Sequence, residues 1–343
     1  MPKTNINYLK ICKDLTKDLS QRTKEVISRR FGFETGERKT LESIGDEYGI
    51  TRERVRQIER DGFSRIEPKL KNYENVLGHF EAELRTAGDL KREDLLFDQL
   101  AGGKNNNCLY FLLTVTKPFQ RFSESQEFYP LWTINTNSLG LAKKVVDAFA
   151  GKFEEIKKPL SFDEIYNLYD KEMATSFDKP LNSQALLSYI EASKKIEPGY
   201  ERYFGLKEWP EITPRGMKDK AYLVLKKEQK PLHFVEVARL IGCYFNQEKV
   251  YPQTVHNELI RDPRFVLVGR GLYALKEWGY EPGVVKDVIF KVLKTAGKPL
   301  TKEEVVQAVL KQRLVKENTV LLNLQGRGEF KRTPEGKYTV RKA

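Results

Sequence analysis

The chain has 343 residues, of which 40% are hydrophobic, and its 60 Lys and Arg exceed its 48 Asp and Glu to give a net charge of +12. This apolar content is enough to build hydrophobic cores, so the composition excludes a wholly disordered chain. No run approaches the ~20 consecutive apolar residues that cross a membrane, and the first residues lack the apolar stretch of a signal peptide. The cysteines Cys12, Cys108 and Cys243 lie far apart in the sequence, which favours neither a zinc site nor a disulfide framework. We therefore expect a soluble, cytoplasmic protein.

The positive charge is concentrated at the two ends of the chain. Residues 1–70 carry 16 basic and 12 acidic side chains, residues 71–284 carry 30 of each, and residues 285–343 carry 14 basic and 6 acidic ones. Two basic ends joined by a neutral middle suit a protein that contacts a polyanion at separate points. A solvated, lysine-rich surface explains the same counts, so charge alone leaves nucleic-acid binding open.

The segment 40–51 has the pattern of a short helix, a tight turn and the start of a second helix. Leu41 and Ile44 share one helical face by their spacing of three residues. Gly49 suits the left-handed conformation that ends a helix, and Thr51 is a good N-cap for the next one. The segment therefore predicts a helix-turn-helix.

The second helix is predicted over residues 51–66, with one apolar and one charged face. The apolar face carries Val55, Ile58, Phe63 and Ile66, and the charged face carries Arg52, Glu53, Arg56, Gln57 and Arg60. Arg can hold guanine through two hydrogen bonds, Gln can pair with adenine, and Glu can accept from the cytosine amino group. A solvated face is the simpler interpretation. However, the charged residues begin at the N-terminal end of this helix, which usually meets the base edges.

The string Thr51-Arg-Glu-Arg-Val-Arg-Gln-Ile-Glu59, preceded by Thr40-Leu-Glu-Ser-Ile-Gly45, resembles region 4 of the primary sigma factors of bacterial RNA polymerase. Residues 22–32 resemble the first helix of that region, and the resemblance as a whole covers residues 5–67. In that family the region reads the −35 promoter element and docks on the flap of the polymerase β subunit. The resemblance therefore implies roles for six residues: base reading by Arg52, Glu53, Arg56 and Gln57, and phosphate or protein contact by Arg54 and Arg60.

Some features depart from the family pattern. Ser43 stands where an acidic residue is usual, and Gly62 stands where the family generally has a better helix former. Glycine inside a helix costs up to ~1 kcal/mol relative to alanine, so we expect the helix to fray early while its reading end stays intact. The short stretch before Arg22 leaves no room for the aromatic-rich domain with which sigma factors melt promoters. We therefore do not expect a self-sufficient sigma factor.

The rest of the chain repeats a unit of similar length four times. Aligned leucines at Leu90, Leu160, Leu232 and Leu300 are separated by 70, 72 and 68 residues, which indicates duplicated domains. Each copy is predicted to contain a helix, an extended stretch at the leucine, two more helices and a closing hairpin, which together make a winged helix. The expected fold is mainly α with small β-hairpins, an N-terminal helix-turn-helix domain followed by four tandem winged-helix units. The expected bounds are 1–70 for the sigma-like domain, 71–136 for a degenerate winged helix, 137–212, 213–280 and 281–343.

The third copy, residues 221–278, resembles the HARE-HTH domain. The resemblance depends on Lys230-Pro-Leu-His-Phe-Val-Glu-Val237, on Tyr251-Pro-Gln-Thr-Val-His256 and on the hairpin segment 264–275. That family includes the delta subunit of some bacterial RNA polymerases, chromatin-associated proteins and domains fused to restriction enzymes. The resemblance implies a binding module without a fixed ligand.

Two hairpins carry candidate contacts to the DNA backbone. Arg270 stands at the predicted tip of the third hairpin, where it either approaches a minor groove or is a solvated turn residue. The fourth hairpin region is strongly basic, so we expect phosphate contacts there. Its cations are Arg327, Lys331, Arg332 and Lys337, with Arg341 and Lys342 just beyond.

The pattern of an enzyme is not found. His79, His233 and His256 lie in different segments, and neither a phosphate-binding Gly-rich loop nor a nucleophile elbow appears. We expect no cofactor, metal ion, membrane contact or small-molecule substrate. The sequence predicts a sequence-specific transcription factor of the bacterial cytoplasm and nucleoid that binds double-stranded DNA at a −35-like element, contacts the β flap of RNA polymerase and modulates initiation. The alternative is a DNA-targeting subunit of a modification or restriction system.

Overall fold

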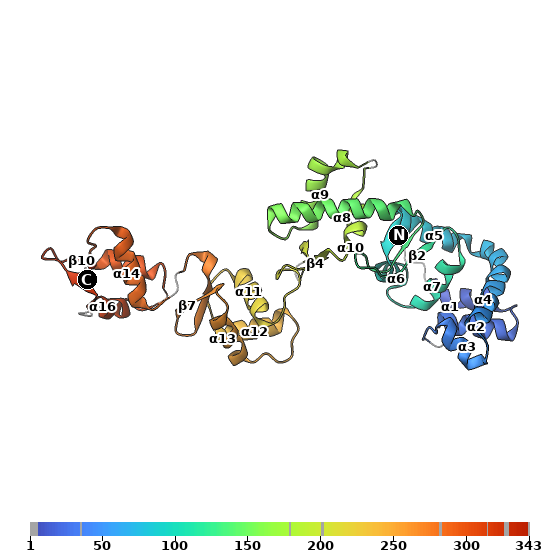
Figure 1. Ribbon diagram of the computed structural model, residues 1–343, viewed down its shortest axis with the longest axis horizontal. Helices are drawn as coiled ribbons and strands as arrows, with labels where there is room; N and C mark the ends of the chain where they lie inside the picture. Colours follow the sequence, from blue (N-terminus) through green and yellow to red (C-terminus); the bar gives the residue numbers. More distant parts are fainter. Residues whose placement is uncertain are drawn as a thin grey trace. The chain divides into compact units, whose positions relative to one another are not determined.

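The structure is a computed structural model that describes residues 6–34, 36–177, 180–199, 202–280, 283–313, 315–325 and 329–341. The protein is mainly helical with small antiparallel sheets (Figure 1). It divides into two compact units, Met1–Ile212 (unit 1) and Thr213–Ala343 (unit 2). Among the residues described, no helix has the length and apolar character needed to cross a membrane.

Unit 1 begins with a group of short, well-capped helices. These are α1 (Tyr8–Thr16), α2 (Gln21–Phe31), α3 (Leu41–Tyr48), α4 (Arg52–Ile66) and the 3-10 helix η1 (Glu67–Tyr73). The side chains of Asn7, Ser20, Thr40 and Thr51 each accept a hydrogen bond from the backbone N–H three residues on. Gly49 ends α3 in the left-handed conformation with φ +63°. The predicted helix, turn and second helix are confirmed.

Two further segments complete unit 1, and they share one order of elements. The first contains α5 (Glu74–Thr86), β1 (Leu90–Arg92), α6 (Glu93–Ala101), α7 (Asn106–Val115), β2 (Gln120–Phe122) and β3 (Leu131–Thr133). The second contains α8 (Asn137–Ile156), α9 (Phe162–Leu168), the π-helical turn η2 (Tyr169–Met173), the 3-10 turn η3 (Ala174–Ser176), α10 (Ser183–Ala192), β4 (Ile196–Pro198) and β5 (Phe204–Leu206).

Unit 2 repeats this order twice more. Its first segment contains α11 (Met217–Glu228), β6 (Leu232–His233), α12 (Phe234–Tyr244), α13 (Pro252–Arg261), β7 (Phe265–Gly269), β8 (Leu272–Leu275) and the 3-10 turn η4 (Lys276–Trp278). Its second segment contains α14 (Val285–Ala296), α15 (Lys302–Leu310), α16 (Glu317–Gln325), β9 (Phe330–Arg332) and β10 (Tyr338–Val340).

One leucine in each of the four segments pairs with the closing strand. Where the leucine belongs to a strand, the closing strand lies in the middle of a three-stranded antiparallel sheet, in the orders β1-β3-β2 and β6-β8-β7. In the other two segments the contact is a single antiparallel bridge. The pairs are Leu90–Thr133, Leu160–Phe204, Leu232–Tyr273 and Leu300–Tyr338. The leucines aligned in the sequence therefore occupy one structural position in all four segments.

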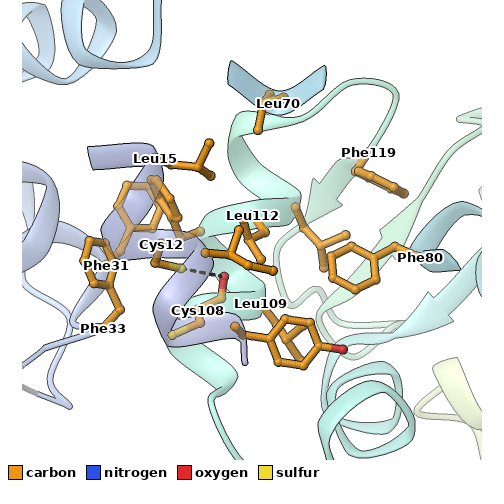
Figure 2. Close-up of a cluster of buried hydrophobic side chains, with 14 of the residues drawn as sticks. Cys12, Leu15, Phe31, Phe33, Leu70, Phe80, Cys108, Leu109, Leu112 and Phe119 are labelled. Carbon is orange, nitrogen blue, oxygen red and sulfur yellow. Dashed lines mark hydrogen bonds between the residues drawn. The ribbon is translucent and has the colours of Figure 1, made fainter. Parts of the chain in front are cut away.

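The helix-turn-helix part shares its main hydrophobic core with the segment that follows it. Figure 2 shows Phe31 and Phe33, at the end of α2, gathered with Cys12 of α1 and Cys108 of α7 in one buried cluster. The Cys12 thiol donates to the carbonyl oxygen of Cys108 over 3.9 Å. The ring of Phe111 lies 5.1 Å from that of Phe31 and 5.2 Å from that of Phe33. One core thus crosses the boundary expected at residue 70, and the five-part division stays a prediction.

The two later segments of unit 1 are joined in a similar way through α10. The Ser188 hydroxyl donates to the carbonyl oxygen of Leu90 at 2.6 Å, and the Tyr189 hydroxyl donates to that of Gly88 at 2.7 Å. Strand β1 therefore lies against α10. The side of α10 that carries Ser188 and Tyr189, which points away from its own segment, is buried inside unit 1.

Candidate nucleic-acid interface

Helix α4 is held by a small core of its own. Val26 of α2, Ile44 of α3 and Val55 of α4 are fully buried against one another. The Tyr48 hydroxyl at the end of α3 donates to the Glu25 carboxylate of α2 at 2.7 Å. Helices α2 and α3 thus fix the direction of α4, and Val55 anchors its N-terminal half in this core.

Gly62 has a packing role that the sequence did not reveal. The expected early fraying of α4 is not found, because the helix continues to Ile66 and Gly62 is buried. A Cβ atom at Gly62 would lie 2.5 Å from Cδ1 of Ile27 and 2.9 Å from Cγ2 of Thr23. The missing side chain lets α2 approach α4 closely, and this packing outweighs the low helix propensity of glycine.

A half-buried ion pair connects the same two helices. Glu59 of α4 lies with Oε1 at 3.4 Å from Nε of Arg30 on α2. Burial raises the pKa of the Glu59 carboxyl, while the nearby Arg30 guanidinium partly opposes that rise. The charged part of the sigma-like string therefore divides in two: Glu59 faces the protein, and the residues before it face solvent.

The four predicted base readers come together on the exposed N-terminal half of α4. Arg52, Glu53, Arg56 and Gln57 are all exposed, as are the predicted backbone contacts Arg54 and Arg60. Within residues 52–57 of α4, Val55 is the only buried residue, so the helix places its neighbours in this stretch on the solvent side. The structure gives these side chains the accessibility that reading of base edges requires.

These side chains are paired with one another in the free protein. The Arg56 guanidinium donates twice to the Glu53 carboxylate, from Nε at 2.8 Å and from Nη2 at 2.6 Å. This hydrogen bond lowers the pKa of the Glu53 carboxyl and raises that of Arg56. Arg54 Nη1 donates to Gln57 Oε1 at 2.9 Å. Neither pair was expected from the sequence, although a spacing of three residues on a helix is the signal that indicates such pairs.

The other predicted DNA-backbone residues belong to unit 2. Arg270 is exposed in the turn between β7 and β8, and Lys331 and Arg332 are exposed on β9. Lys337 is half-buried, with Nζ 3.7 Å from the Glu335 carboxylate. Arg327, like Lys342, lies outside the described residues.

The geometry places this part of the chain in the class of helix-turn-helix modules with an exposed, arginine-rich second helix. Residues 17–67 match the family described as Sigma-70, region 4. The predicted resemblance to that region is confirmed for this segment, and it supports a DNA-binding, transcription-related role. Sigma region 4 is a module that interacts with DNA and RNA polymerase. The HARE-HTH resemblance stays a prediction.

Three curated relatives are sigma factors. Over 54 residues the chain is 50% identical to "RNA polymerase sigma factor sigB" of Arabidopsis thaliana, which is 16% of this chain and 9% of that protein. Over 47 residues it is 49% identical to "RNA polymerase principal sigma factor HrdD" of Streptomyces viridifaciens and 47% identical to the protein of the same description from Streptomyces griseus. Those two matches cover 14% of each chain. The chain thus spans a small part of the length of these relatives.

Metal-ligating residues do not gather in the part of the chain that the structure describes. There, no group of three or more His, Cys, Asp and Glu side chains is close enough to hold a metal ion.

Proposed function

We propose that this protein is a transcription factor that reads a −35-like promoter element through α4 and contacts RNA polymerase at the β flap, modulating initiation in the bacterial cytoplasm and nucleoid. The observation that carries the proposal is the exposed set Arg52, Glu53, Arg56 and Gln57 on the N-terminal half of α4. It lies inside the segment that matches sigma region 4. The names of the relatives, all sigma factors of RNA polymerase, support the polymerase contact.

The free protein prepares these side chains for an exchange of partners. Arg56 gives up its two hydrogen bonds to Glu53 and forms two to the O6 and N7 atoms of a guanine. Glu53 is then free to accept a hydrogen bond from a cytosine amino group. Gln57, released from Arg54, pairs with adenine, and Arg54 becomes available to a phosphate together with Arg60.

The basic hairpins of unit 2 would add contacts that carry no sequence information. We assign the phosphate contacts of unit 2 to Arg270, Arg327, Lys331, Arg332 and Lys337, which belong to the segments 213–280 and 281–343. We interpret these two segments, like 71–136 and 137–212 of unit 1, as winged helices. The charge excess of residues 285–343 and the exposure of Lys331 and Arg332 support this interpretation.

The decisive experiment compares two arginines of the same helix. Duplexes preferred by the full chain are first selected from a random pool, and binding of Arg56→Ala is then measured on a preferred and on a random duplex. We expect a loss of about 1–3 kcal/mol on the preferred duplex and a much smaller one on random DNA, because a bidentate guanine contact has that size. Arg65→Ala, which removes an exposed charge near the other end of α4, should affect both duplexes alike. Equal losses for Arg56→Ala on both duplexes would contradict base reading.

The polymerase contact has its own test. The full chain should retain core RNA polymerase on a column, and core enzyme that lacks the β flap tip should pass through. Retention that does not depend on the flap would remove that part of the proposal. If core enzyme is not retained at all, the alternative role as a targeting subunit of a DNA modification or restriction system is favoured.

A further inference from the structure

The fold brings together two cysteines that are 96 residues apart in the sequence, Cys12 on α1 and Cys108 on α7. The Cys12 Sγ atom lies 3.9 Å from the carbonyl oxygen of Cys108, and the two thiols also form a hydrogen bond with each other. Figure 2 shows both side chains in the shared core of unit 1. Their distance in sequence, which disfavoured a disulfide framework, therefore does not reflect their position in the fold.

The pair has the arrangement that a disulfide needs. An S–S bond is about 2.05 Å long and joins side chains whose Cβ atoms lie about 3.5–4.5 Å apart. Two thiols that are already in hydrogen-bonding contact reach this geometry by rotation about χ1 and a small shift of α1 against α7. Both cysteines are free thiols in the structure, as is Cys243, which is exposed in unit 2.

The two sulfur atoms differ in how readily they ionise. The hydrogen bond between the thiols, together with burial, raises the pKa of Cys12. The same hydrogen bond lowers the pKa of Cys108, although burial opposes this. Cys108 is also the third residue of α7, and the N-terminal end of a helix favours a thiolate. Cys108 is therefore the nucleophile of the pair, and Cys12 is the thiol that keeps its proton.

A reagent reaches the pair through the first turn of α7, because both sulfur atoms are buried in the closed structure. Residues 102–106, directly before this turn, are all exposed, and a Cβ added at Gly102 would meet no atom within 4 Å. Asn107 connects the turn to the loop after α2, since its Nδ2 donates to the carbonyl oxygens of Gly32 at 3.0 Å and Gly36 at 2.9 Å. A local opening of this loosely packed end exposes Cys108 first.

We propose that Cys12 and Cys108 are a redox-sensitive pair that forms a reversible disulfide with a hydroperoxide, Cys108 reacting first and Cys12 resolving the product. The bond would close residues 12–108 into one covalent loop that contains α2, α3 and α4. It would hold the helix-turn-helix on the segment that follows it. The proposal uses none of the exposed residues of α4 and does not depend on the function proposed for them.

The chemistry requires the hydroperoxide and the two thiols. The Cys108 thiolate attacks one peroxide oxygen, the O–O bond breaks, and the other oxygen takes up the proton that Cys108 had released and leaves as water or an alcohol. The sulfur is oxidised by two electrons to a sulfenic acid while the peroxide is reduced. The Cys12 sulfur then attacks the Cys108 sulfur, the S–O bond breaks, and the hydroxyl leaves as water with the Cys12 proton. A dithiol reductant restores both thiols by exchange and becomes a disulfide itself.

The first test identifies the bond and the order of reaction. The full chain with Cys243→Ser, which removes the exposed thiol, is treated with hydrogen peroxide, alkylated and digested, and the peptides are analysed by mass spectrometry. We expect a linked pair of peptides containing Cys12 and Cys108, which dithiothreitol separates. Adding Cys12→Ala should leave a sulfenic acid on Cys108 that dimedone traps, whereas adding Cys108→Ala should leave Cys12 largely unlabelled. Absence of the linked pair, or preferential labelling of Cys12, would overturn the proposal.

The second test measures the consequence for stability. Calorimetry of the oxidised and the reduced chain should show the midpoint of unit 1 raised by about 4–16 °C on oxidation, because the closed loop restricts the unfolded chain. Cys12→Ala should lack this rise while still unfolding cooperatively when reduced. A midpoint that stays the same or falls on oxidation would overturn the stabilising link between α1 and α7.

The third test examines the entry route. Asn107→Ala, which removes both hydrogen bonds to the loop after α2, should speed disulfide formation several-fold and give the same product. Asn106→Ala, a neighbouring exposed position, is the matched control and should leave the rate unchanged. Equal rates for Asn107→Ala and the unsubstituted chain would overturn entry through the first turn of α7.

Discussion

Helices α7 and α13 occupy the same place in the order of elements but are used in opposite ways. α7 packs its outward side against α1 and α2, so that a helix-turn-helix and the next segment share one core. α13 leaves the corresponding side open and lines it with polar groups. One arrangement of three helices and a hairpin therefore either covers the outward side of its third helix, as at α7, or leaves that side exposed, as at α13.

The largest expected effect comes from breaking the shared core of unit 1. Phe111→Ala in α7 should lower the free energy of unfolding of unit 1 by about 3–5 kcal/mol, because it removes a fully buried ring that packs on Phe31 and Phe33. DNA binding through α4 should weaken as unit 1 loses stability. Phe111 itself is fully buried and is not one of the exposed residues of α4. Hydrogen exchange resolved by segment is the measurement.

The matched substitution in unit 2 is Leu259→Ala in α13, which is also buried. It should destabilise unit 2 by about 2–5 kcal/mol and leave the Arg56-dependent binding unchanged. If Phe111→Ala raised exchange in α7 while α2 and α4 kept their protection, the two parts of unit 1 would be independent and the comparison would fail.

A smaller effect, with a change of sign, is expected from two glycines of unit 1. Gly62→Ala should destabilise the protein by about 1–3 kcal/mol, since the added methyl group meets Ile27 and Thr23 where the helices are closely packed. Gly78→Ala in α5 should instead stabilise it by about 0.5–1 kcal/mol, because no atom lies within 4 Å of the new Cβ. Chemical denaturation of both variants measures the difference, and two effects of the same sign would show that α2 and α4 are not in close contact.

The charged surface of unit 2 can be tested through salt. Lys331→Ala combined with Arg332→Ala should flatten the dependence of log affinity on log salt concentration by about 0.9 for each phosphate that these side chains neutralise. The ratio of specific to random binding should stay constant, because phosphate contacts carry no base information. An unchanged slope would mean that β9 does not touch DNA.

The smallest expected effect concerns a partly buried hydrogen bond between α1 and η1. The Tyr73 hydroxyl donates to Asp14 Oδ2 at 2.6 Å, which raises the pKa of Tyr73 to about 12. The raised value means that this hydrogen bond stabilises the fold below pH 10 and that its contribution disappears between pH 10 and about 12. Tyr73→Phe should cost about 0.5–1 kcal/mol after allowance for solvent screening. A denaturation midpoint followed against pH checks this, and the variant should lack the alkaline step.

The sequence was sufficient for local features whose cause is local. The ends of α3 and α4 were predictable because Gly49, Thr40 and Thr51 act on the backbone within a few residues of themselves. The aligned leucines were also visible, since a repeated spacing in sequence leaves a repeated position in the fold.

Other features depend on partners that lie far away in the sequence. The apolar residues of α7 predict that a face is buried, but not that Phe31 and Phe33 are what cover it. The sequence predicted that Gly62 would destabilise α4. Its packing role could not be seen there, because its contact residue Ile27 belongs to a different helix, α2. At the candidate site, by contrast, the residues were found from their types, and the pairing of Arg56 with Glu53 could have been predicted from their spacing of three residues on a helix.

The paired state of Arg56 and Glu53 also affects how the protein would move along DNA before it finds its site. The Arg56 guanidinium already donates two hydrogen bonds to Glu53. At a wrong base pair no equivalent acceptors replace them, so Arg56 would stay paired with Glu53 there. Residence at unrelated sequences then depends on phosphate contacts alone, which salt screens and which exchange rapidly. If Arg56 reads a base as proposed, the ion pair opens at the correct sequence and the complex becomes slow to dissociate. Arg56 and Glu53 would thus allow rapid exchange on non-specific DNA and slow dissociation from the specific site.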